Sequence, residues 1–319
     1  MGTNTNEMRM NNMTDSIIKL EGIHFFYNGF QAIHGVSLDI GAGVYGLLGP
    51  NGAGKTTMMK IILGHLAPAS GIGMVLGTSM DSGLTAVRRR IGYMPESHCL
   101  IPGMDAVTLT AYMGELSGMP RQEAIKRAHE VLYYVGLEES RYRVADTYSS
   151  GMKQRLKLAL ALVHDPELMI LDEPTSGMDP GGREEMLELI RDIAEKGSMN
   201  MIISSHILAD IEKTCGQVLI MNAGRIVSRQ HTRDFNSRET SIFEVGIKGD
   251  TRTFLELLPE IQAETDRRGF LRLHLPADYP PMTLFRHALD AGVQIRHFRP
   301  SRLTLEDAFV TAIGESHAR

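Results

Sequence analysis

Cysteine and long apolar runs are both scarce in this chain of 319 residues. Only Cys99 and Cys215 occur, and they form no CxxC pair. This excludes a disulfide framework and gives no support for a zinc site, so a reducing compartment is the simplest expectation. No stretch approaches the roughly 18 consecutive apolar residues of a membrane span, so we expect that the chain does not cross a membrane alone.

Basic charge is also limited, because 33 Lys and Arg residues stand against 38 Asp and Glu residues. A nucleic-acid binder usually carries a basic footprint, so we expect no nucleic-acid partner. Residues 1–15 are polar and rich in Asn, Thr and Met, without the basic and apolar regions of a signal peptide. We expect this segment to form a disordered tail.

Strand and helix patterns alternate through the first two-thirds of the chain. Residues 17–40 alternate polar and apolar positions around the turn Asn28-Gly29, which predicts an antiparallel sheet. Helical periodicity dominates residues 102–148 and predicts an inserted helical subdomain. Buried strands are expected at residues 43–48, 168–171 and 200–204, and helices at residues 55–63, 152–163 and 184–196. Such alternation predicts an α/β core with a mainly parallel sheet.

The pattern restarts after Arg229 and predicts a second, small α/β domain over residues 235–319. Strands are expected at residues 242–247, 270–275 and 293–298, and helices at residues 254–258, 284–291 and 305–313. The charged runs at residues 88–90 and 183–185 are expected to be solvated faces.

A glycine-rich loop follows the predicted strand at residues 43–48 and fits the phosphate-binding pattern GxxxxGK[ST]. Glycines allow backbone N–H groups to curl around phosphates, and the next helix presents its positive N-terminal end. Lys55 can reach the β- and γ-phosphates, and the Thr56 hydroxyl can ligate Mg²⁺. The strand before and the helix after disfavour a chance turn. The candidate phosphate-binding residues are Gly49, Pro50, Asn51, Gly52, Ala53, Gly54, Lys55, Thr56 and Thr57.

Two adjacent acidic residues, Asp172 and Glu173, directly follow the predicted strand at residues 168–171. They would repel each other without compensating partners. A Mg²⁺ ion held by Asp172, directly or through water, and an attacking water beside Glu173 would supply that compensation. Glu173 would then be the general base. The alternative is that the pair only caps a helix.

Three further motifs occur in an order that is typical of one family. Residues 148–155 have the sequence YSSGMKQR, Asp179 ends the sequence SGMD, and Ser204-Ser205-His206 end the next predicted strand. Over about residues 17–229 this order resembles the nucleotide-binding domain of ABC transporters. The resemblance implies a P-loop NTPase core over residues 16–230, with a parallel sheet, an antiparallel β subdomain and a helical subdomain at about residues 97–150. It also implies ATP hydrolysis with Mg²⁺ and membrane permease subunits as partners.

Individual roles follow from the resemblance. Tyr27 matches the aromatic residue that stacks on adenine, although it could instead be a core aromatic. His206 matches the histidine that contacts the γ-phosphate. Asp179 matches the residue that links two composite sites. The signature residues that cap the ATP of the opposite subunit are matched by Ser149, Ser150 and Gly151. A single copy of each motif implies a dimer, and we expect a homodimer.

Two departures from the family pattern concern the signature and the residue Glu96. The usual signature is Leu-Ser-Gly-Gly-Gln, whereas residues 148–152 are YSSGM. Most members have Gln at the position of Glu96, where it senses Mg²⁺. We expect Glu96 either to ligate the metal or to convey movement to the helical subdomain. Pro95-Glu96 and the ending LTLEDAF at residues 303–309 resemble the ABC-2-type, drug-exporter-like subgroup.

The leading expectation is therefore the ATPase subunit of an exporter, held on the cytoplasmic face of the membrane through its permease. One alternative is a soluble ABC-type switch that acts on ribosomes or DNA. The single motif set, the acidic balance and the C-terminal ending argue against that alternative. A regulatory module that binds ATP without turnover is disfavoured because Lys55, Asp172, Glu173 and His206 are all present.

Overall fold

The computed structural model describes residues 16–82, 85–97, 99–197, 199–232, 240–265, 269–276, 279–301 and 309. The expected tail at residues 1–15 and the expected helix at residues 305–313, apart from Phe309, lie outside this part. Two compact units are present, one up to Gln230 and one beginning at His231. In the described part of the chain, no helix is both long and apolar enough to cross a bilayer.

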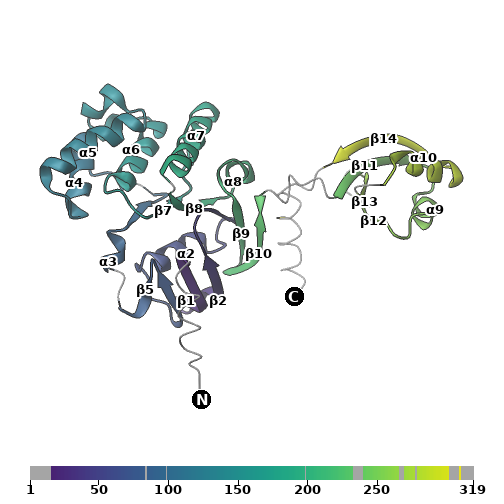
Figure 1. Cartoon of the computed structure of the whole chain (residues 1–319), viewed down its shortest axis with the longest axis horizontal. Helices are drawn as coiled ribbons and strands as arrows, with labels where there is room; N and C mark the ends of the chain where they lie inside the picture. The colour runs from purple at the N-terminus through teal and green to yellow at the C-terminus, as the bar shows by residue number, and fades with distance from the viewer. Residues whose placement is uncertain are drawn as a thin grey trace, which may run out of the picture. The chain divides into compact units, whose positions relative to one another are not determined.

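A six-stranded sheet forms the centre of the first unit, with strand order β10-β9-β3-β8-β7-β6 (Figure 1). The pairs β3·β8, β3·β9, β7·β8 and β6·β7 are parallel. Its inner strands are nearly continuous apolar runs, as expected of a parallel sheet that is covered on both faces. The strands are β3 (Val44–Leu48), β6 (Ile91–Met94), β7 (Leu168–Asp172), β8 (Asn200–Ser205), β9 (Gln217–Asn222) and β10 (Arg225–His231).

A second sheet of this unit, with order β2-β1-β4-β5, is antiparallel where its pairs are described. Its first hairpin turns at Asn28 and Gly29, both with positive φ, as a two-residue hairpin turn requires. The antiparallel sheet predicted from residues 17–40 is confirmed. The strands are β1 (Ile18–Tyr27), β2 (Phe30–Ile40), β4 (Ser70–Val75) and β5 (Thr78–Ser79).

Helix α2 (Lys55–Ile62) packs between the two sheets. Its residues Met58, Met59, Ile61 and Ile62 are buried in one core together with side chains of β1, β2, β3 and β7. Further helices of the unit are α3 (Thr85–Arg88), α6 (Ser150–Leu162), α7 (Pro180–Gly197) and α8 (Leu208–Thr214), with a short η1 turn (Met80–Ser82). Helix α7 begins four residues before the predicted start, because Gly181 and Gly182 give no helical signal.

A helical insertion lies between β6 and β7 in the sequence and confirms the predicted helical subdomain (Figure 1). Its parts before α6 are α4 (Ala106–Leu116), α5 (Arg121–Tyr134), η2 (Glu138–Tyr142) and η3 (Ala145–Thr147). The Asp105 carboxylate accepts a hydrogen bond from Thr108 N at 2.9 Å and so caps α4. Small residues let α4 and α5 approach closely, and an added Cβ on Gly114 would lie 3.2 Å from that of Ala124.

Two arginines of the charged runs are not simply solvated, so that expectation was wrong for them. Arg90 pairs with Glu167, with Nε and Oε1 at 2.5 Å. Arg183 of α7 pairs with Asp210 of α8, whose carboxylate is buried and also accepts the Thr175 hydroxyl at 2.7 Å. These partners lie 77 and 27 residues away in the sequence, so the local charge pattern could not reveal them.

The second unit is a four-stranded antiparallel sheet of order β12-β13-β11-β14. Its chain order β-α-β-β-α-β and this strand order match the split βαβ, ferredoxin-like arrangement. Phe254, Leu273 and Leu284 are among its buried core residues. The elements are β11 (Thr240–Lys248), α9 (Thr251–Glu256), β12 (Gln262–Thr265), β13 (Leu271–Pro276), α10 (Pro281–Asp290) and β14 (Gln294–Ser301).

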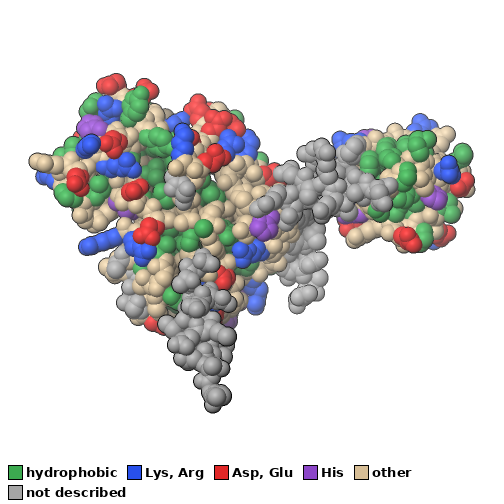
Figure 2. Space-filling view, in the orientation of Figure 1, with side chains coloured by type: hydrophobic (Ala, Val, Ile, Leu, Met, Phe, Trp, Pro, Cys, Tyr) green, Lys and Arg blue, Asp and Glu red, His purple; other side chains and the backbone are tan. Residues whose placement is uncertain are grey.

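Hydrophobic side chains gather on the visible face of this second unit (Figure 2). On α10, Met282, Phe285 and Leu289 are exposed while Leu284 and Ala288 are buried. The spacing of the exposed residues places them along one stripe of the helix, and at its edge the Phe285 ring packs against Phe298 of β14, with the ring centroids 5.1 Å apart. This unit therefore has an apolar stripe outside its core.

Candidate nucleotide-binding and hydrolysis site

The phosphate loop at residues 49–54 connects β3 to α2. Gly52 and Gly54 have positive φ, and an added Cβ on Gly49 would lie 2.3 Å from the Met221 carbonyl oxygen. Glycine is therefore required for this loop conformation. Lys55, the first residue of α2, donates from Nζ to the Gly49 carbonyl oxygen at 2.7 Å, and its side chain is buried. A loop of this shape before a helix N-terminus can cradle an anion.

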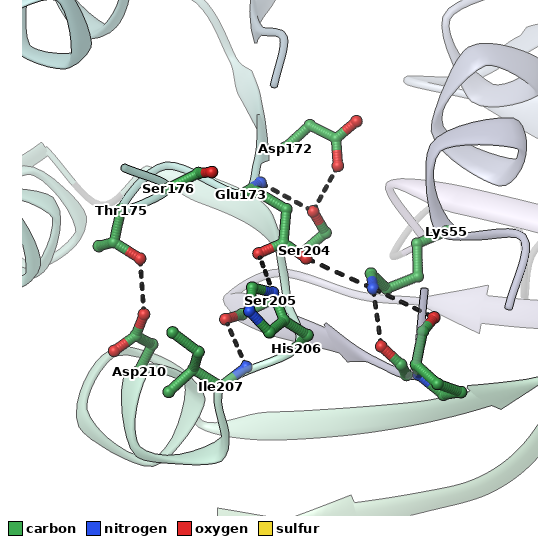
Figure 3. Close-up of polar contacts among 12 residues, drawn as sticks. Lys55, Asp172, Glu173, Thr175, Ser176, Ser204, Ser205, His206, Ile207 and Asp210 are labelled. Carbon is green, nitrogen blue, oxygen red and sulfur yellow. Dashed lines mark hydrogen bonds and ion pairs between the residues drawn. The ribbon is translucent and has the colours of Figure 1, made fainter. Parts of the chain in front are cut away.

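Asp172, at the end of β7, shares its two carboxylate oxygens between two hydroxyls. Oδ2 accepts from Thr56 Oγ1 at 2.8 Å, and Oδ1 accepts from Ser204 Oγ at 2.5 Å. Ser204 in β8 also accepts a hydrogen bond from Glu173 N at 2.9 Å. The hydroxyl of Ser204 therefore holds both neighbouring acidic residues in place (Figure 3).

Glu173 lies just beyond β7 with a positive φ of 50°. A non-glycine residue in this region costs about 1–3 kcal/mol, and the surrounding structure must hold it there. Its carboxylate lies between two groups: Lys55 Nζ is 3.4 Å from Oε1, and His206 Nδ1 is 2.8 Å from Oε2 (Figure 3). An ionised carboxylate can only accept, so His206 Nδ1 carries the proton of this hydrogen bond.

A cavity of about 740 Å³ lies over the loop, a volume that suits a nucleotide-sized ligand. Residues far apart in the sequence line it together, from Tyr27 near the start of the first unit to Ala223 and Gly224 near its end. Gly49 and His206 are connected to it through their hydrogen bonds with Lys55 and Glu173. Of the predicted site residues, those that line it are Tyr27, Pro50, Asn51, Gly52, Ala53, Gly54, Lys55, Thr56, Thr57, Glu96, Asp172 and Glu173.

Phe30 also lines this cavity and was missed in the sequence prediction. It pairs directly with Tyr27 across the first hairpin, so both rings stand on the same face of the sheet. Phe30 is 73% exposed and Tyr27 is 41% exposed, so both rings can meet a ligand. The two-residue turn Asn28-Gly29 was the signal that could have identified Phe30 as a partner of Tyr27.

The signature residues and Asp179 lie outside this cavity. Ser149 is the N-cap of α6, where its hydroxyl accepts from Met152 N at 3.3 Å. Ser149 and Ser150 are exposed, and Gly151 is half-buried. Asp179 precedes α7 and accepts from Gly182 N at 3.3 Å. Within the described residues, none of these four lines the cavity of its own chain.

Oxygen ligands for a hard cation are present at the cavity wall. The Thr56 hydroxyl and the Asp172 carboxylate lie 2.8 Å apart, and they are the donor types that Mg²⁺ prefers. Among the described residues, no group of three or more His, Cys, Asp and Glu side chains could hold a metal ion. A metal here would therefore depend on Thr56, Asp172 and the phosphates of a nucleotide, and a contribution from Glu96 stays a prediction.

Comparison with known proteins identifies the family. Residues 33–176 match the family model described as ABC transporter. The bacitracin transport ATP-binding protein BcrA of Bacillus licheniformis is 32% identical over 310 residues, which cover 94% of this chain and 98% of that protein. The daunorubicin/doxorubicin resistance ATP-binding protein DrrA of Streptomyces peucetius is 33% identical over 229 residues, which cover 72% of this chain and 69% of DrrA.

Solved structures agree with this result. CbiO1 from Clostridium perfringens, part of the ABC transporter complex CbiONQ, has a TM-score of 0.63 and 28% identity, covering 69% of this chain and 90% of that one. The dimeric bacterial ABC transporter cassette MJ0796 has a TM-score of 0.63 and 25% identity, covering 68% of this chain and 99% of that one. The predicted fold class and ATPase activity are thereby confirmed. The chain belongs to the ATP-binding proteins of ABC transporters.

Proposed function

We propose that this chain hydrolyses ATP to drive export through separate membrane permease subunits. One observation carries the proposal: the Glu173 carboxylate lies between Lys55 and His206 at the wall of the phosphate-loop cavity. The names of the two relatives, which refer to bacitracin transport and to drug resistance, support export. The chain would work on the cytoplasmic face of the membrane, held there by the permease.

The contacts of Lys55 indicate how ATP binding prepares Glu173 for hydrolysis. A γ-phosphate in the cavity offers the Lys55 ammonium a more highly charged partner than Glu173 does, so ATP draws Lys55 away from that carboxylate. Glu173, still held by His206, then accepts a proton from water. The water oxygen bonds to the γ-phosphorus as the bond to ADP breaks. Mg²⁺, held by Thr56 and Asp172, would neutralise part of the phosphate charge.

The signature residues support a dimer as the active form. Ser149, Ser150 and Gly151 lie at the N-terminus of α6, where backbone N–H groups favour an anion. Because they do not line the cavity of their own chain, we assign them to the ATP held by a second copy, with Asp179 between the two sites. The dimeric MJ0796 cassette is a precedent.

Residues 235–319 would be an accessory domain that tunes the ATPase or its contact with the permease. All the ATP motifs end by His206, and the compact unit that begins at His231 has a core of its own. A unit with its own hydrophobic core is the kind of segment that can fold as a separate domain.

The test is the variant Glu173→Gln, which removes the basic carboxylate but keeps the size of the side chain. We expect turnover to fall by about 10²–10⁴-fold while ATP-loaded dimers accumulate. The matched control is Glu167→Gln, since this surface carboxylate pairs with Arg90 away from the site. Steady-state phosphate release and light scattering with ATP measure both effects. Wild-type turnover in Glu173→Gln would show that Glu173 is not the base.

A further inference from the structure

A second groove, of about 550 Å³, lies beside the N-terminal half of α6. Ser150 and Gln154 of α6 line it, as do Ser176 and Gly177 of the loop after Glu173. Among the described residues, Glu96 is the one that lines both this groove and the nucleotide cavity. The segment at Pro95-Glu96 therefore separates the nucleotide cavity from the helix that begins with the signature residues.

Lys157 of α6 also lines the groove, and its side chain is only 5% exposed. Its ammonium donates to two consecutive backbone carbonyl oxygens, that of Pro95 at 2.6 Å and that of Glu96 at 3.0 Å. Burial lowers the pKa of Lys157, while the negative charges of nearby groups, including Glu96 and Asp172, act in the opposite direction. The ammonium thus fastens the Glu96 segment to α6.

Gln154 lies one turn before Lys157 on the same face of α6. Its Nε2 donates to the Ser176 carbonyl oxygen at 2.7 Å, and its side chain is also buried. Ser176 in turn donates from its backbone N to the Glu173 carbonyl oxygen at 3.0 Å. One face of α6 is therefore hydrogen-bonded to two of the segments that reach the nucleotide cavity, the one at Glu96 and the one after Glu173.

From Leu156 to Leu162, every residue of α6 other than Lys157 is apolar and buried, for example Leu158 and Ala159. A methionine or leucine at position 157 could fill the same space without the desolvation of a charge. Burial of an ammonium is unfavourable unless hydrogen bonds compensate. Packing alone does not explain a lysine here, but a need for donors that reach the Pro95 and Glu96 carbonyls does.

We propose that Lys157 is a positioning residue that transmits movement of the Glu96 segment to the signature residues Ser149–Gly151. When a nucleotide enters the cavity, the Glu96 segment moves, and Lys157 carries α6 with it toward the partner's ATP. This inference rests on the proposed roles of Glu96 and of the signature residues. It assigns a positioning role to a residue that contacts neither the nucleotide nor the metal.

The test compares Lys157→Met with Lys126→Met, which removes a highly exposed lysine from α5 of the same helical subdomain. In Lys157→Met we expect ATP affinity within about threefold of wild type, kcat at least about tenfold lower and KM little changed. Lys126→Met should match the wild type in all three. Wild-type kcat and ATP-driven dimerisation in Lys157→Met would overturn the proposal. Lack of turnover in the wild type would instead refute the proposed function.

A distance measurement separates transmission from simple stabilisation. Spin labels at Ile72→Cys and Tyr133→Cys, both exposed sites, report on the core and the helical subdomain in a Cys99→Ser, Glu173→Gln background. Mg²⁺ and ATP should shift the distance distribution in the chain that keeps Lys157, but not in the chain that also carries Lys157→Met. If the latter does not fold, Lys157→Gln, which is neutral and shorter, should show the same loss. A nucleotide-dependent shift of wild-type size in either variant would contradict the proposal.

Discussion

The hydroxyl of Ser204 gives the sharpest prediction about the hydrolysis site. It is fully buried, donates to Asp172 Oδ1 at 2.5 Å and accepts from Glu173 N at 2.9 Å. Ser204→Ala removes only the oxygen, so the Asp172 carboxylate and the Glu173 backbone N both lose their hydrogen bond to this side chain. A hydrogen bond to a charged group contributes about 1.5–3 kcal/mol and a neutral one about 1 kcal/mol. We expect the variant to lose about 3 kcal/mol of stability.

Activity should fall as well, because the Ser204 hydrogen bond to Glu173 N helps to hold the positive φ of that residue. A base that is displaced by a fraction of an ångström loses alignment with the attacking water, and we expect kcat to fall by about tenfold or more. Ser205→Ala is the matched control, since its hydroxyl is equally buried but accepts only from Ile207 N at 3.0 Å among the described contacts. That variant should lose about 1 kcal/mol.

Urea denaturation followed by circular dichroism measures the two losses of stability, and phosphate release measures kcat. The C-terminal unit is identical in both variants, so its contribution cancels in the comparison. Equal stability of Ser204→Ala and Ser205→Ala, or a wild-type kcat in Ser204→Ala, would refute the reasoning from the doubly bonded hydroxyl.

Three other predictions concern the adenine contact, the metal and the domain boundary. Tyr27→Ala and Phe30→Ala should each weaken ATP binding about 5- to 100-fold, because each variant removes one ring that can stack on adenine. Phe26→Ala should leave ATP binding unchanged, and calorimetry measures the three affinities. Glu96→Gln should make ATP affinity depend less steeply on Mg²⁺ if Glu96 ligates the metal, and superimposable Mg²⁺ titrations would leave it as a mechanical coupler. A chain ending at Gln230 should still bind ATP, and failure of that chain to fold would make the C-terminal unit part of the core.

Much of the fold could be predicted because its inner strands are continuous apolar runs next to distinctive loops. For this reason the predicted bounds of strands β3, β7 and β8 agree with the structure to within one residue. The strand β4 was missed, since its sequence SGIGMV has glycines where alternation would be expected. The edge strand β12, with the sequence QAET, has too little apolar character to be recognised.

The site could be predicted wherever its chemistry depends on neighbours in the sequence. The phosphate loop and Asp172-Glu173 are such cases, and the structure brings them to one cavity. Contacts between distant residues gave no signal, as with Lys157 and the Pro95 carbonyl oxygen, which belong to residues 62 positions apart. Side-chain donors to backbone carbonyls leave no pattern, because the backbone of every residue offers the same acceptor.

The positive φ of Glu173 has a consequence for laboratory evolution of this protein. Glycine adopts that conformation without a steric penalty, so Glu173→Gly would relieve the backbone strain while removing the carboxylate. Selection for thermal stability alone would therefore favour chains that have lost the base, and enzymatic turnover would have to be selected in parallel to keep it. At position 173, glycine would favour thermal stability because of the positive φ, whereas catalysis requires the glutamate, so the two properties conflict.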